Sequence, residues 1–194
     1  MAITRRAFMQ GAMLSACVLP GWTWSESEVK FGRRLQVDQV VFDARRSDAL
    51  AFAQTARHLG ARTRAFNGSV SPRECQDLLA RLQIRKTSVA GLTDFRSLFL
   101  LQAMAAGAGL KPVLRIHHPT RGNADTHEAF GTQAYREICN SRLARYRDSW
   151  AHEAANLVLN LPMRTGDVVH ATDNLDEADL RVLGSRAMVT WVIA

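Results

Sequence analysis

The sequence predicts a single α/β domain, a three-layer sandwich with a mainly parallel sheet of about five strands. Short β-branched runs alternate with helical patterns at intervals of about 25 residues, and this alternation favours a parallel sheet covered on both faces. Hydrophobic residues make up 47% and charged residues 22%, the balance of a globular core. The 194 residues are too few for an eight-stranded α/β barrel, which needs ~200–250.

Two strand–helix steps are predicted in the first half of the domain. Residues 37–42 form a β-branched run that ends at Asp43 and predicts a buried strand. A helix follows, and Ser47 is the residue expected to cap it. Residues 62–66 predict the second strand, which the turn residues Asn67-Gly68 bring to an end.

A second helix and a third strand come next. Ser71-Pro72-x-Glu74 has the cap, the proline at the first helical position and the acid that begin a helix, which is expected to end near residue 82. Residues 87–92 predict the third strand. Thr93 or Asp94 is then expected to cap a strongly apolar helix.

The last part of the domain contains the fourth and fifth predicted strands. The fourth covers residues 112–116 and ends in His117-His118-Pro119. Residues 127–159 are predicted to be helical with a break near Asn140, and residues 186–194 form a final apolar strand. Together these elements favour a Rossmann-like or flavodoxin-like sheet.

The net charge of +7 does not predict a nucleic-acid partner. Two of the charges belong to leader arginines, and without them 23 basic residues face 18 acidic ones, a balance of +5. Nucleic-acid-binding proteins gather basic residues on one face with aromatic residues among them, whereas here the arginines are spread over helix surfaces. We expect solvated surface at the densest group, Arg142, Arg145 and Arg147, and also at His152-Glu153.

The first ten residues contain a paired-arginine motif, Met1-Ala2-Ile3-Thr4-Arg5-Arg6-Ala7-Phe8-Met9-Gln10. This resembles the twin-arginine translocation (Tat) signal, in which Ser or Thr precedes two arginines, followed by any residue, Phe and an apolar residue. Arg5, Arg6 and Phe8 are the targeting residues that the resemblance implies. A weakly apolar segment over residues 7–16 follows and is too short to span a bilayer. The alternative is a chance arginine pair in an ordinary N-terminal helix.

The resemblance implies a route and a destination. Tat signals direct folded proteins across the bacterial inner membrane, so the domain is expected in the periplasm, with the Tat translocase as its partner during export. Passengers of this route often carry a cofactor or travel with a co-exported protein. The resemblance therefore raises the expectation of a cofactor or a partner, and the sequence identifies neither.

The end of the leader leaves the fate of Cys17 open. Leu14-Ser15-Ala16-Cys17 resembles a lipobox, whose cysteine is diacylated and anchors the protein to a membrane. Alternatively, Cys17 is one more small apolar residue of the leader. We divide the chain into a signal peptide with its cleavage region (1–25), a tether (26–35) and a single α/β domain (36–194). Membrane contact is expected only through the leader or a lipid on Cys17.

Polar side chains follow the predicted strands at their carboxyl ends, where open parallel sheets bind ligands. Asp43, Asp94 and His117 are the candidate catalytic residues, because each ends or follows a different strand. His117, His118 and His127 are the candidate metal ligands, since imidazoles and carboxylates bind zinc, iron or manganese.

These candidates also have structural explanations. Asp94 is suited to capping a helix, and Asp43 to pairing with one of the two arginines that follow it. Adjacent strand residues point to opposite faces of a sheet. At most one of His117 and His118 is therefore expected to face a given pocket.

Common catalytic motifs do not occur in the sequence. It has no Gly-x-Gly-x-x-Gly, no Gly-Lys-Ser/Thr phosphate loop and no Gly-x-Ser-x-Gly nucleophile elbow. Cys75 and Cys139 are expected to be buried free thiols. The favoured hypothesis is an exported, folded accessory or ligand-binding protein of the cell envelope. The alternative is a small metal-dependent or hydrolytic enzyme with its site at the carboxyl edge of the sheet, and a third hypothesis is a cofactor-loaded redox protein.

Overall fold

A computed structural model describes residues 35–85, 87–118, 127–160 and 187–194. The predicted leader, Cys17 and nearly all of the predicted tether lie outside these ranges. The described residues form an α/β domain with six strands and five α-helices. No helix among them has the length and apolar character needed to cross a membrane.

The strands and helices follow one another in the predicted order, with one additional strand. In chain order they are β1 (Val37–Asp43), α1 (Ser47–His58), β2 (Arg62–Phe66), α2 (Pro72–Arg85), β3 (Ser88–Asp94), α3 (Phe95–Gly107), β4 (Pro112–His118), β5 (Glu128–Phe130), α4 (Gln133–Arg145), a 3-10 turn (Arg147–Ser149), α5 (Trp150–Asn160) and β6 (Met188–Ile193). All five predicted strands are confirmed as β1, β2, β3, β4 and β6.

Helix boundaries show which sequence signals are used. Ser71 and Glu74 form the expected reciprocal cap, because each backbone N–H donates to the side chain of the other residue. Asp94 caps α3 by accepting a hydrogen bond from the backbone N–H of Ser97 at 2.8 Å. The predicted cap at Ser47 is wrong: α1 begins at Ser47, and the cap residue before it makes no side-chain hydrogen bond to the helix.

The segment predicted to be helical from 127 to 159 begins with a strand instead. β5 pairs antiparallel with the end of β4, and the helical break falls around the 3-10 turn rather than at Asn140. Asn140 lies within α4, where its side-chain oxygen accepts a hydrogen bond from the backbone N–H of Ala129 at 3.1 Å. The polar residue that suggested a break therefore ties the helix to β5.

The predicted solvated position of Glu153 is also wrong. Glu153 is buried on α5 and forms an ion pair with Arg142 of α4, whose side chain is 44% exposed. The carboxylate is compensated by an arginine that reaches it from the surface, which is how a charged residue can occupy a helix–helix contact.

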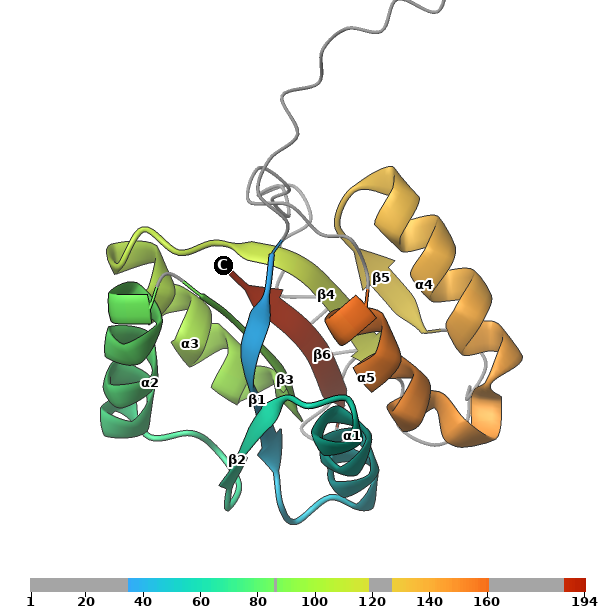
Figure 1. Ribbon diagram of the computed structural model, residues 1–194, viewed down its shortest axis with the longest axis horizontal. Coiled ribbons are helices and arrows are strands. Elements are labelled where there is room, and N and C mark those ends of the chain that lie inside the picture. Colours follow the sequence, from blue (N-terminus) through green and yellow to red (C-terminus); the bar gives the residue numbers. More distant parts are fainter. Residues whose placement is uncertain (1–34, 86, 119–126, 161–186) are drawn as a thin grey trace, which may run out of the picture. The chain divides into compact units, whose positions relative to one another are not determined.

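The sheet has six strands in the order β2-β1-β3-β6-β4-β5 and is mixed rather than mainly parallel (Figure 1). β1 runs parallel to β2 and β3, whereas β6 runs antiparallel to both β3 and β4, and β5 runs antiparallel to β4. The expectation of a mainly parallel sheet is therefore corrected. Apolar periodicity reports the burial of a strand but not its direction, so residues 186–194 predicted a strand without its orientation.

Helices lie on both faces of the sheet (Figure 1). Alternate residues along the strands separate into two apolar clusters, because successive side chains point to opposite faces. One cluster joins the sheet to α1, α4 and α5 through residues such as Phe42, Leu92 and Ile116. The other joins it to α2 and α3 through residues such as Val41 and Trp191.

Trp191 on β6 packs against a glycine of the neighbouring strand. A Cβ on Gly91 would lie 2.5 Å from Cζ2 of the Trp191 ring and 2.8 Å from Cγ2 of Val41. The indole Nε1–H of the fully buried Trp191 donates to the hydroxyl oxygen of Thr93 at 3.0 Å. The absence of a side chain at Gly91 therefore leaves the space that the Trp191 ring, the largest side chain of this cluster, occupies beside β3.

We predict that Gly91→Ala lowers the free energy of unfolding by about 1–3 kcal/mol, the usual cost of adding a methyl group to a filled core. The matched control is Gly107→Ala in the last turn of α3, where a Cβ meets nothing within 4 Å. That change should be neutral or stabilising by up to ~1 kcal/mol, because alanine favours helices. Urea denaturation followed by tryptophan fluorescence measures both, and equal stability of the two variants would contradict the packing of Trp191 on Gly91.

Candidate functional site

The carboxyl ends of β1, β3 and β4 lie at one edge of the sheet. β6 is antiparallel to both β3 and β4, so these two strands run in the same direction although they are not neighbours. Asp94 and His118 both pair with Met188 of β6, on opposite sides of it. Asp43, at the end of β1, lies at the same edge because β1 is parallel to β3.

The structure does not bring the three candidate catalytic residues together. Asp43 and His117 are at equivalent heights on β1 and β4, and β3 and β6 lie between those strands. Three strand spacings of ~4.8 Å place their backbones about 14 Å apart. Within the described part of the chain, no three His, Cys, Asp or Glu side chains are placed to hold one metal ion.

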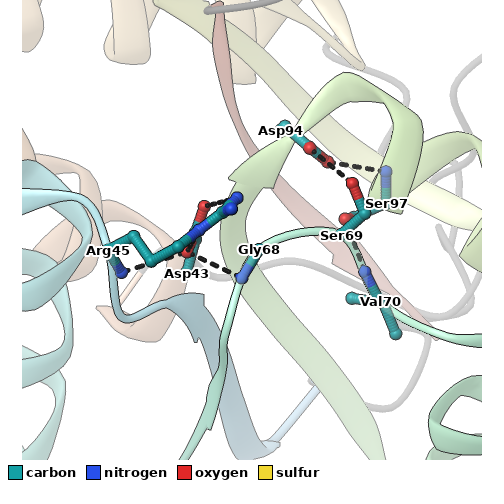
Figure 2. A network of polar contacts seen from close by, with 7 residues as sticks. All are labelled: Asp43, Arg45, Gly68, Ser69, Val70, Asp94 and Ser97. Atoms are coloured by element: carbon teal, nitrogen blue, oxygen red, sulfur yellow. Dashed lines mark hydrogen bonds and ion pairs between the residues drawn. The ribbon is translucent and has the colours of Figure 1, made fainter.

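Asp43 forms a clamp between two loops (Figure 2). Its carboxylate is buried and accepts hydrogen bonds from the backbone N–H groups of Arg45 and Gly68, and from Nε and Nη2 of Arg45 at 3.2 Å each. Gly68 has a φ of +96°, and a Cβ there would lie 2.5 Å from Cζ of Arg45, so the guanidinium group rests on a bare backbone. The clamp ties the loop after β1 to the loop after β2.

Electrostatics at this clamp favour the ionised carboxylate. Burial by itself would raise the pKa of Asp43, but the hydrogen bonds from the Arg45 side chain and from the two backbone N–H groups outweigh it, and the pKa lies below its usual value. Oδ1 of Asp43 accepts three of these hydrogen bonds and Oδ2 accepts one. Asp43 is therefore suited to structure and leaves little capacity for a metal ion.

Asp94, at the end of β3, has a similar structural role and binds the same loop between β2 and α2. Besides capping α3, its carboxylate accepts a hydrogen bond from the hydroxyl group of Ser69 at 3.1 Å (Figure 2). The hydroxyl of Ser97 accepts a hydrogen bond from the backbone N–H of Val70 at 3.0 Å. The first turn of α3 is thus fastened to the loop between β2 and α2.

His117 lies on the face of the sheet that carries Trp191. The ring centroids of His117 and Phe130 are 4.7 Å apart. The guanidinium carbon of Arg115 lies 4.6 Å from the Phe130 centroid. His117 is 4% exposed, and its Nε2 has no hydrogen-bond partner among the described residues. Burial, aided by the positive charge of Arg115, lowers the pKa of His117 to about 4.

His118 lies on the opposite face, as expected for the residue next to His117. It is 2% exposed and stacks on the indole ring of Trp150, with ring centroids 4.0 Å apart. Its Nε2 is 2.7 Å from the hydroxyl oxygen of Thr190, and its Nδ1 is 2.8 Å from Nδ1 of His127. Burial, and after it the neighbouring histidines, hold the pKa of His118 well below its usual value.

These contacts form a chain of hydrogen bonds, which we call the histidine relay: Thr190, His118 and His127. It runs from the middle of β6, where Thr190 is fully buried, to the partly buried ring of His127 at the sheet edge. Burial lowers the pKa of His127, so the relay is neutral at pH 7. Its last atom, Nε2 of His127, is buried and has no hydrogen-bond partner among the residues that the structure describes.

Sequence reasoning identified the two histidines but missed Thr190 and Trp150. A signal for Thr190 was present, because it is the one polar residue in the apolar run 187–194. A hydroxyl inside a fully buried strand needs a hydrogen-bond partner, which points to a polar neighbour. No comparable signal marks Trp150, whose stacking on His118 depends on where α5 begins.

The two cysteines that the structure describes do not contribute to the candidate site. Cys75 and Cys139 are buried free thiols, as predicted. Burial raises the pKa of Cys75 to about 11 and that of Cys139 to about 12, so neither is a reactive thiolate at neutral pH.

Comparisons with models of protein families, with curated proteins and with solved structures give no match to this chain. The candidate site is therefore defined by its geometry.

We predict that acid destabilises the domain through its buried histidines. The folded pKa of His117 is about 4 against 6.5 for the free side chain, so the unfolded chain binds the proton more readily and stability falls as pH drops below about 6.5. For His117 alone, the loss between pH 7 and pH 5 is about 2 kcal/mol. His117→Phe should remove that part of the pH dependence in urea titrations.

The matched control is His58→Phe, which replaces an exposed histidine on α1 and should retain the wild-type dependence. A His117→Phe variant that loses stability as steeply as the wild type between pH 7 and pH 5 would show that His117 does not resist protonation.

Proposed function

We propose that this chain is an exported, folded ligand-binding or accessory protein of the bacterial cell envelope, with its ligand site at the carboxyl end of β4. The observation that carries the proposal is the histidine relay and its unpartnered end at Nε2 of His127. For the domain we propose the three-layer sandwich, supported by helices on both faces. The positions of β2, β1, β3 and β4 follow the flavodoxin-like order, with β6 inserted.

A buried polar nitrogen without a partner supports a binding site. Leaving such a group unsatisfied costs about 1–3 kcal/mol. The other relay atoms are satisfied, so this cost falls on the one atom nearest the edge of the sheet. A ligand that supplies the missing partner recovers that free energy on binding, and the ring of Trp150 gives it an apolar wall beside the histidines.

Enzymatic hydrolysis is the alternative, and the geometry supports it less well. Thr190, His118 and His127 have the spacing of a nucleophile, a base and a group that orients the base. Thr190 is 0% exposed in the middle of β6, however, so a substrate cannot reach its hydroxyl group without displacing core side chains, whereas His127 is only partly buried. The carboxylates of Asp43 and Asp94 are engaged in the clamp and the helix cap, which leaves binding as the better supported activity.

The destination in the proposal is supported by the leader motif. Arg5, Arg6 and Phe8 match the Tat signal in their spacing, and the Tat route accepts folded passengers. We propose the periplasm as the location, with the Tat translocase and a possible co-exported protein as partners, and Cys17 as the attachment point if a lipid is added. The hydrogen bonds between distant loops in the domain suit a passenger that folds before export.

We predict that Arg5→Lys combined with Arg6→Lys abolishes export, because the Tat motif depends on the arginine pair. Cell fractionation and immunoblotting in the native host measure the result. The wild type should be periplasmic or membrane-attached and the variant cytoplasmic, while Arg33→Lys with Arg34→Lys serves as a matched control outside the motif. Export of the leader variant at the wild-type level would contradict the Tat route.

We also predict a bound ligand in the protein purified from its native host. Native mass spectrometry should show a mass above that of the polypeptide and any lipid on Cys17. His127→Phe removes the unpartnered nitrogen and should lose this excess, whereas His58→Phe, an equal change at an exposed position, should keep it. A wild-type protein with no excess mass would contradict the proposed binding function.

A further inference from the structure

We infer that His127 presents a hydrogen-bond donor, Nε2–H, to its ligand, and that the contacting ligand atom is an oxygen of a carboxylate or phosphate group and not a metal ion. This inference rests on the proposed binding site at the histidine relay. It follows from assigning each proton of the relay to an atom. Thr190, at the buried end of the relay, has the fewest possible partners.

Thr190 sets the direction of the relay. Its hydroxyl is fully buried, and among the described residues its hydrogen-bond partner is Nε2 of His118, at 2.7 Å. A hydroxyl has one proton to donate, and a buried donor without an acceptor is more costly than an acceptor lone pair left unused. The proton of Thr190 is therefore directed at His118, whose Nε2 must carry a lone pair.

The tautomer of His118 then determines that of His127. A neutral imidazole carries one proton, so His118 with a bare Nε2 is protonated at Nδ1. Its Nδ1 lies 2.8 Å from Nδ1 of His127, a distance that requires one donor and one acceptor. His118 donates, Nδ1 of His127 accepts, and the proton of His127 is on Nε2.

The inferred tautomer selects the ligand. A metal ion needs an imidazole lone pair, and in this arrangement both lone pairs of the relay are already engaged by hydrogen bonds. Nε2 of His127, the relay atom without a hydrogen-bond partner among the described residues, therefore carries a hydrogen, and this N–H group requires an acceptor. Carboxylate and phosphate oxygens form the strongest such bonds.

The opposite arrangement has a recognisable cost. If His127 carried its proton on Nδ1, His118 would be protonated on Nε2 and would donate to Thr190. The Thr190 hydroxyl proton would then have no acceptor among the described residues, at a position that is 0% exposed. The first arrangement leaves its unpaired donor at Nε2 of His127 instead, on a residue that is only partly buried and where an acceptor on the ligand satisfies it. In that arrangement Nε2 of His127 would be a lone pair suited to a metal ion, so the two possibilities predict different ligands.

The test is nitrogen-15 NMR of the full-length chain labelled at histidine, at pH 7, with acetate, inorganic phosphate and Zn²⁺ as separate probes. We expect long-range correlations to show His118 protonated on Nδ1 and His127 on Nε2. Acetate or phosphate should shift the Nε2–H resonance of His127, with affinity reduced about 10- to 100-fold in His127→Phe. Zn²⁺ should leave the His127 nitrogen shifts unchanged.

Three results of the NMR experiment would overturn the inference: a His127 ring protonated on Nδ1, coordination of Zn²⁺ at Nε2 of His127, or a Nε2–H resonance that neither anion perturbs. Thr190→Val removes the group that sets the direction and keeps the shape of the side chain. It should allow a measurable fraction of the other tautomer, and an unchanged tautomer would show that Thr190 does not set it. A metal found in the native protein would refute this inference and leave the binding function intact, whereas an empty native protein would refute the function.

Discussion

The antiparallel strand β6 is the element on which the rest of the structure depends. It lies between β3 and β4, so it joins the parallel strands β1, β2 and β3 to the pair formed by β4 and β5. Its two faces carry different interactions. Trp191 lies on Gly91 and donates to Thr93 on one face, while Thr190 bonds to His118 on the other. The same strand thus completes the core and sets the buried end of the histidine relay.

The position of β6 also explains why the candidate residues divide into separate groups. It adds one strand spacing between the end of β3 and the end of β4, which keeps the carboxylates of Asp43 and Asp94 away from the histidines. The carboxylates hold loops and a helix terminus in place. The histidines at the end of β4 face opposite sides of the sheet, and among the residues that the structure describes His118 is the one that forms a hydrogen bond to another histidine, His127.

Much of the fold follows from local sequence signals, and the site follows from them only in part. Apolar runs located five strands, and the residues Ser71, Glu74 and Asp94 marked helix starts, because both signals act over a few residues. Strand direction and the three-residue strand β5 depend on pairing between distant segments, which periodicity does not report. The contacts of His118 with Thr190 and Trp150 arise in the same way, across 72 residues in the case of Thr190.

In the proposed relay, Thr190 directs the protons so that Nε2 of His127 is a hydrogen-bond donor. Neutron diffraction from a deuterium-exchanged crystal at pH 7 tests it most directly, because it locates each deuteron. We predict deuterons on the Thr190 hydroxyl pointing to His118, on Nδ1 of His118 and on Nε2 of His127. A deuteron on Nδ1 of His127, with Nε2 of His118 donating to Thr190, would contradict it.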